Sequence, residues 1–186
     1  DFNTLSRTKN MEAPLANAKG ARILIDHHQQ PQTEVFTYGV SDTTKSSTCE
    51  MVYDLIMASE NGAHISMDVA TCLYTGLMTD TGSFRFPATT ASVHRMIAHL
   101  KDLGLDHTVV HSHIFDNSLE NRLRFIGYVL LNRMEVLYEC NTAIMYITKQ
   151  DLHRFDIKTG DTEGLVNYLL GIKGMKFGAI VIDRDE

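Results

Sequence analysis

The sequence predicts an α/β protein built on a parallel sheet, with a second, smaller α/β domain towards its C-terminus. Short apolar runs alternate with longer segments in which apolar residues recur at helical spacing, the pattern of strands connected by helices. After residue 115 this alternation gives way to one long helical segment and then to β-rich runs. A domain boundary is therefore expected in or beside the long helix.

The N-terminal part is expected to hold two short strands and four helices. Residues 21–25 contain the continuous apolar run Ile23-Leu24-Ile25, which is typical of a parallel strand buried on both faces. A second strand is expected at residues 35–39. Helices are expected at residues 11–19, 46–59, 66–78 and 90–103. Ser47 or Thr48 can cap the second of these helices.

The C-terminal part is expected to hold a long helix, a β-hairpin, a further helix and a last strand. The helix spans residues 117–134, and the two β-rich runs of the hairpin flank Cys140-Asn141-Thr142. The second helix lies near residues 163–170, and the last strand at residues 176–183. The expected organisation is a first domain at 1–116, a connecting helix at 117–134 and the start of a second domain at 135–186.

Composition and charge limit the classes of protein that fit. The 186 residues are 44% hydrophobic and carry a net charge of −6, which suits a globular protein without a large non-specific nucleic-acid surface. The three cysteines are widely spaced, so we expect reduced thiols and a cytoplasmic protein. No run is long and apolar enough to predict a membrane span. The chain begins at Asp1 and ends on a strand-like run, so we expect it to be part of a longer protein.

Asp26-His27-His28 directly follows the first predicted strand, at the carboxyl end where parallel sheets bind ligands. Imidazole and carboxylate groups are natural ligands of Mn, Fe or Zn ions. The alternative is a solvated polar loop. His107, His111 and His113, by contrast, are expected on loops or helix ends, in surface or capping roles.

Two further stretches carry candidate residues. In "LMTDTGSFRF" (residues 77–86), Asp80 lies among small hydroxyl and glycine residues that allow a metal or phosphate to approach, and Arg85 suits phosphate oxygens. The alternative is a helix C-terminus and a turn. Asp1 is a further candidate if a strand precedes it, and a frayed terminus otherwise.

Taken together, these motifs resemble the DHH family of phosphoesterases. Residues 25–28 (Ile-Asp-His-His) are similar to its signature motif, and residues 79–84 (Thr-Asp-Thr-Gly-Ser-Phe) to a later motif. Asp1, with Arg7 downstream, is similar to the motif that lies between the family's N-terminal metal motif and Asp-His-His. The pattern within the family is that of small cytosolic enzymes that degrade very short oligonucleotides and dephosphorylate 3'-phosphoadenosine 5'-phosphate. The family's His-x-x-x-Asp-x-Asp motif and its Gly-Gly-Gly-His stretch are not in this sequence.

The resemblance implies two bound divalent metal ions, usually Mn²⁺, with Mg²⁺ or Co²⁺ as alternatives. It implies that Asp1 bridges the ions, that His27 and Asp80 are ligands, and that Asp26 orients His27. It also implies that His28 faces the scissile phosphate. Because the first motif is missing, these residues are too few to hold both ions.

The resemblance also implies a reaction and a substrate. We expect hydrolysis of short oligoribonucleotides, and of a nucleoside bisphosphate, by a metal-activated water, with Ser83 and Arg85 as phosphate contacts. The alternatives are an exopolyphosphatase or inorganic pyrophosphatase, and a nucleotide-binding module without catalysis. If the protein acts on polyphosphate, we expect a dense cluster of basic residues in the C-terminal domain. Lys173, Lys176 and Arg184 are too few to decide between the two substrate classes. A homodimer is expected by analogy.

Overall fold

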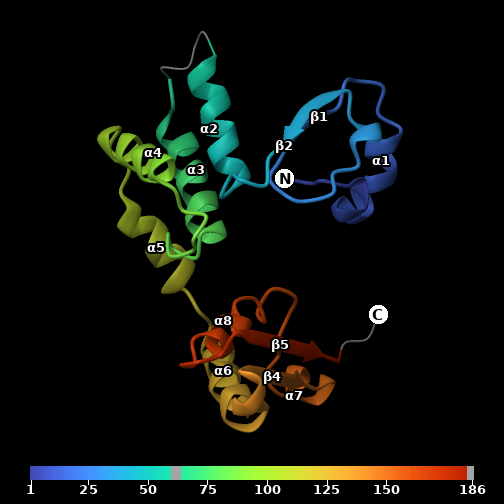
Figure 1. Ribbon diagram of the computed structural model, residues 1–186, viewed down its shortest axis with the longest axis vertical. Coiled ribbons are helices and arrows are strands. Elements are labelled where there is room, and N and C mark those ends of the chain that lie inside the picture. The colour runs from blue at the N-terminus through green and yellow to red at the C-terminus, as the bar shows by residue number, and fades with distance from the viewer. Residues whose placement is uncertain (60–63, 184–186) are drawn as a thin grey trace. The chain divides into compact units, whose positions relative to one another are not determined.

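The computed structural model describes residues 1–59 and 64–183, and it divides into two compact units, residues 1–114 and 115–186 (Figure 1). Both units combine helices with parallel strand pairing, so the predicted α/β fold is confirmed. The division falls close to the predicted domain boundary at 116/117. Arg184 lies outside the described residues. In the described ranges, no helix has both the length and the apolar character that crossing a membrane requires.

The first unit contains a parallel pair of short strands, β1 (Ile23–Asp26) and β2 (Tyr38–Ser41), with Asp26 opposite Ser41. The prediction that β1 is buried on both faces is wrong, because Leu24 is buried whereas Ile23 is 66% exposed. Successive strand residues point to opposite faces: Leu24 and Asp26 are buried on one face, whereas on the other Ile23 is exposed and Ile25 half-buried. The buried face therefore carries Asp26 into the interior at the carboxyl end of β1.

The segment before β1 differs from the single helix predicted at residues 11–19. A 3-10 helix, Leu5–Met11, leads into the short helix α1, Glu12–Ala16. Lys9 has a positive φ of 54°, which breaks the regular helix there. Leu5 is buried and anchors this segment to the unit.

Three of the predicted helices of the first unit form where expected, as α2 (Thr48–Ala58), α3 (Met67–Asp80) and α4 (Ala91–Asp102). Each begins at a hydroxyl residue whose side chain accepts a backbone N–H, namely Ser47, Ser66 and Thr90. Apolar residues of α3 and α4 form most of the core: Ala70, Leu73, Tyr74, Leu77, Met78, Val93, Met96 and Leu100. Figure 1 shows α2 and α3 side by side.

A further helix, α5 (His107–Phe115), forms where loops or helix ends were predicted. Asp106 caps it by accepting the Thr108 N–H at 2.9 Å, and Val110 joins the core. His111 Nε2 lies 3.0 Å from the hydroxyl of the buried Tyr74. The histidines of α5 therefore lie on a packed helix.

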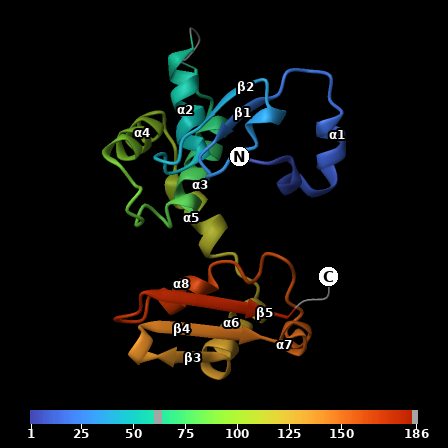
Figure 2. The ribbon, with the colours of Figure 1, turned by 45° about the vertical axis from the view of Figure 1, so that its right-hand side comes forward.

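The second unit is a three-stranded sheet with helices. The strands, in the order β3–β4–β5, are Met134–Leu137, Thr142–Ile147 and Phe177–Ile182 (Figure 2). β3 and β4 are antiparallel, which confirms the predicted hairpin, and β4 and β5 are parallel. Asn141 makes the left-handed turn of the hairpin with φ 49°.

Three helices accompany this sheet: α6 (Glu120–Asn132), α7 (Lys149–Arg154) and α8 (Leu165–Leu170). α6, the segment predicted as a connection, contributes Phe125, Ile126 and Val129 to the core of the second unit. α7 was not predicted, and it starts with a capping box in which Thr148 and Asp151 satisfy each other's backbone N–H groups.

Candidate metal centre

The chain that leaves β1 carries two histidines in succession, and the end of β2 holds it in place. The Asp42 N–H donates to the Asp26 carbonyl at 2.9 Å, which continues the pairing of the two strands beyond their last residues. The Ser41 hydroxyl donates to the His28 carbonyl at 2.6 Å. These bonds fix the backbone from which His27 and His28 project.

Four side chains from distant parts of the sequence meet here, and we call them the acid–histidine cluster: Asp1, His27, His28 and Asp80. Single ligand atoms of Asp1, His27 and His28 all lie within 4.8 Å of one another. His27 Nε2 is 3.7 Å from Asp1 Oδ1 and 3.9 Å from Asp80 Oδ2. His28 Nδ1 is 3.3 Å from Asp1 Oδ1.

A backbone carbonyl orients His27. Its Nδ1 lies 3.3 Å from the Lys45 carbonyl oxygen. Because a carbonyl only accepts, this contact assigns the hydrogen to Nδ1 and leaves the lone pair of Nε2 facing Asp1 and Asp80. A histidine that ligates a metal through one nitrogen usually donates its other N–H in this manner.

Asp26 supports His28, which corrects the prediction that it orients His27. Its carboxylate accepts the His28 backbone N–H and lies 3.0 Å from His28 Nδ1. The physical reason is that side chains alternate along an extended chain, so residues 26 and 28 share a side and residue 27 does not. An Asp side chain also bonds readily to the backbone N–H two residues later.

The start of α2 contributes two contacts that sequence reasoning treated only as helix caps. The Ser47 hydroxyl accepts the Cys49 N–H as the cap and donates to Asp80 Oδ2 at 2.7 Å. The Thr48 hydroxyl donates to Asp1 Oδ1 at 2.8 Å. The run of hydroxyl residues in Ser46-Ser47-Thr48 could have indicated these contacts. One helix needs only one cap, so the other hydroxyl groups were free to have a second role.

Ser83 and Arg85 are not brought into the acid–histidine cluster. The chain turns sharply after Asp80, with φ of 57° at Gly82, 58° at Ser83 and 64° at Phe84. Arg85 Nε donates to the Gly82 carbonyl at 2.7 Å. Within residues 1–59 and 64–183, no hydrogen bond or ion pair joins either side chain to the cluster.

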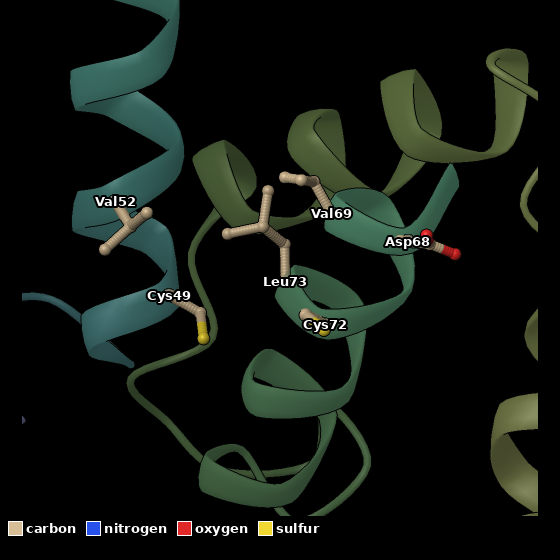
Figure 3. Close-up of a pocket in the computed structure, with 6 residues that line it drawn as sticks. All are labelled: Cys49, Val52, Asp68, Val69, Cys72 and Leu73. Carbon is tan, nitrogen blue, oxygen red and sulfur yellow. The ribbon is translucent and has the colours of Figure 1, made fainter. Parts of the chain in front are cut away.

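A separate apolar pocket of about 340 Å³ lies between α2 and α3 (Figure 3). Its lining residues are Cys49, Val52, Asp68, Val69, Cys72 and Leu73. Burial raises the pKa of the Cys49 thiol. The Cys49 sulfur also fills the space beside Gly76, where a Cβ would come within 2.2 Å of it. This close approach of α2 and α3 lies one helical turn before Asp80 and lets Ser47 reach that carboxylate.

The donor set of the acid–histidine cluster fits a divalent transition-metal ion. Carboxylate oxygen with imidazole nitrogen suits Mn, Fe or Zn. Two ligands bonded to one ion at about 2.1 Å lie about 3–4 Å apart, which matches the separations around His27 Nε2. Asp26 Oδ2 is buried with no hydrogen-bond partner among the described residues, so a cation nearby would compensate its charge.

Residues 1–77 match the model of the DHH family, N-terminal domain. This match covers the N-terminal acid and the Asp-His-His triplet of the cluster, and it supports the resemblance to the DHH family. Asp80 lies just beyond the matched residues.

Several known proteins are similar to this chain. The bifunctional oligoribonuclease and PAP phosphatase NrnA of Bacillus subtilis is 27% identical over 171 residues, which are 90% of this chain and 53% of that protein. A crystal structure of an exopolyphosphatase-related protein from Bacteroides fragilis has 36% identity and a TM-score of 0.90, over 98% of this chain and 53% of that one. A probable manganese-dependent inorganic pyrophosphatase of Streptococcus equi is 33% identical over 111 residues, 48% of this chain and 36% of that protein. The chain thus spans about half the length of the first two.

Proposed function

We propose that this protein is a divalent-metal-dependent phosphoesterase that hydrolyses short oligoribonucleotides and 3'-phosphoadenosine 5'-phosphate. The observation that carries the proposal is the acid–histidine cluster at the carboxyl end of β1, where carboxylates and imidazoles from residues 1 to 80 converge. The similarity to NrnA, a bifunctional oligoribonuclease and PAP phosphatase, supports this substrate class.

In this proposal, Asp1, His27 and Asp80 hold the ion. When bound, a divalent ion lowers the pKa of a coordinated water and polarises the attacked phosphoryl group. Lys45 and Ser47 keep His27 and Asp80 aimed at the ion through the hydrogen bonds they make. Mn²⁺ is the proposed ion, supported by the similarity to a probable manganese-dependent pyrophosphatase. The second ion, a homodimer and a cytoplasmic location stay predictions.

His28 acts on the substrate in this proposal. Asp26 holds its Nδ1 side, so its Nε2 is directed away from the carboxylate that supports it. A histidine held in this way can stabilise the charge that develops on the phosphate and protonate the leaving oxygen. His28 and Asp26 are therefore the proposed catalytic pair.

A phosphoanhydride hydrolase is the second candidate. The similarity to the exopolyphosphatase-related structure and to the probable pyrophosphatase supports it. The two candidates differ in the bond that is cleaved, so substrates separate them directly.

The test is turnover by the full protein with Mn²⁺ on a di-adenylate, on 3'-phosphoadenosine 5'-phosphate and on pyrophosphate. We expect turnover of the first two, and a loss of about 100-fold or more in His28→Ala. His113→Ala removes an exposed histidine of α5 and serves as the matched control. Turnover of pyrophosphate alone would favour the second candidate. Metal binding without turnover of any substrate would refute the proposed enzymatic activity and favour a nucleotide-binding module without catalysis.

A further inference from the structure

Arg7 reaches the acid–histidine cluster from the N-terminal segment. Its Nη2 lies 3.4 Å from His28 Nε2, the nitrogen on the far side of the ring from Asp26. Because guanidinium only donates, His28 Nε2 is the acceptor of this contact in the substrate-free protein, before it takes up the proton that its proposed acid role requires. Arg7 and the proposed catalytic imidazole therefore face the same space.

Hydrogen bonds hold Arg7 in this position although it is exposed. Its Nη1 donates to Asn3 Oδ1 at 3.1 Å. Asn3 is itself held against the loop after β1, because its Nδ2 donates to the Gln29 carbonyl at 2.7 Å and its carbonyl accepts the Gln32 N–H at 2.7 Å. The buried Leu5 anchors the chain between Asn3 and Arg7. The same short segment thus carries a metal ligand at one end and a positioned cation at the other.

We propose that Arg7 binds a non-bridging oxygen of the substrate phosphate, a role that rests on the phosphoesterase function proposed above. A guanidinium has five N–H donors in a planar fork that matches phosphate geometry. Only some of these donors are used by Asn3 and His28. The side chain is exposed, and its remaining donors have no hydrogen-bond partner among the described residues, so they are available to an anion.

The other nearby cations are occupied elsewhere. Lys45 Nζ pairs with Asp54 at 2.6 Å and with Glu50 at 3.3 Å, and Arg85 Nε is bonded to the Gly82 carbonyl. In the part of the chain that the structure describes, Arg7 is the cationic side chain that contacts the cluster. A phosphate that approaches the carboxylates of Asp1 and Asp80 therefore meets Arg7 as its protein-borne counter-charge.

The test uses Arg7→Gln and Arg7→Lys in the full protein, with Arg95→Gln as the control, because Arg95 is an exposed arginine of α4. We expect Arg7→Gln to raise the KM for a di-adenylate about 10- to 100-fold, the range for a charged hydrogen bond, and Arg7→Lys to restore part of it. Inorganic phosphate should bind the Mn²⁺-loaded Arg7→Gln protein correspondingly more weakly in calorimetry. The Mn²⁺ affinity, followed by electron paramagnetic resonance, should change by less than about 3-fold, because Arg7 is not a ligand.

Three results would overturn the assignment. One is wild-type phosphate affinity in Arg7→Gln. Another is a loss of phosphate binding in Arg85→Gln and not in Arg7→Gln. The third is a collapse of Mn²⁺ affinity in Arg7→Gln, which would indicate a structural role. Phosphate binding that depends on Arg7 in a protein without turnover would refute the proposed function and leave the anion site intact.

Discussion

The two nitrogens of His27 have different partners, and this difference makes its role testable. The Lys45 carbonyl holds Nδ1, and Nε2 faces Asp1 and Asp80. A neutral imidazole fixed in this tautomer needs no reorganisation to bind an ion. The neighbouring His28 has different partners, because its Nδ1 lies against the Asp26 carboxylate and its Nε2 against the Arg7 guanidinium.

We therefore expect His27→Ala to lower Mn²⁺ affinity by at least about 100-fold. Replacing a residue that only orients a metal ligand already lowers metal affinity about 10- to 100-fold, and His27 is proposed to bind the ion directly. The measurement is a Mn²⁺ titration followed by electron paramagnetic resonance. His113→Ala, which removes a histidine far from the cluster in sequence, should bind as the wild type does. Equal affinity in His27→Ala and the wild type would remove His27 from the ligand set.

The sequence identifies the residue types of this site better than their contacts. Asp26, His27, His28 and Asp80 stand out because Asp26 ends a strand, the two histidines follow it, and Asp80 ends a helix. The alternation of side chains decides which histidine Asp26 supports, and this alternation could have been read from the sequence alone. The position of Arg7 could not be predicted from the sequence, because it depends on how Asn3 fixes an irregular segment.

At the scale of elements, the segment from Lys45 to Glu50 organises the site. It makes one contact to each of three proposed ligands, which are His27, Asp80 and Asp1. Glu50 stabilises the segment from within, since its buried carboxylate accepts the Ser46 N–H and hydroxyl at 3.1 Å each. A buried carboxylate is favourable only when it is paired and hydrogen-bonded, and the Lys45 side chain supplies the charge.

Ser47→Ala separates the two roles of the Ser47 hydroxyl. Loss of the cap should lower the free energy of unfolding by about 1 kcal/mol, and loss of the bond to Asp80 should also weaken Mn²⁺ binding about 10-fold or more. Thr90→Ala is the matched control, because Thr90 caps α4 and has no contact with the cluster among the described residues. Urea unfolding and a metal titration measure the two effects. If Thr90→Ala weakened metal binding as much as Ser47→Ala, the effect on the metal would follow from stability alone.

Over the whole molecule, the predicted α/β class and hairpin hold, whereas two helices were missed for physical reasons. α7 has six residues and depends on its capping box rather than on an apolar repeat. α5 buries mainly Val110, so its sequence lacks the repeated apolar positions that predict a helix. The exposure of Ile23 also escapes a pattern-based prediction, because an apolar run does not tell which face of a strand is covered.

The second unit has an ion pair of its own that makes its stability depend on pH. Asp151 is buried, and Arg133 Nη2 donates to its Oδ1 at 2.9 Å. Burial alone would raise the pKa of Asp151. Hydrogen bonds from Arg133 and Thr148 outweigh this effect and hold the pKa well below its ordinary value. This carboxylate therefore stabilises the folded unit above the ordinary pKa of Asp, and the stabilisation is lost as the pH falls towards the lowered value.

Asp151→Asn should consequently cost about 2 kcal/mol at neutral pH, because it weakens a buried charged hydrogen bond and the cap of α7. The cost should shrink as the pH falls below about 4, where the wild-type carboxylate begins to lose its advantage. Hydrogen exchange of the β4 and β5 amides reports on this unit alone. Asp156→Asn is the control, because Asp156 is exposed, lies 4.0 Å from Lys158 and should change little. A cost for Asp151→Asn that stayed constant from neutral to acidic pH would show that the stabilisation does not come from the ionised carboxylate.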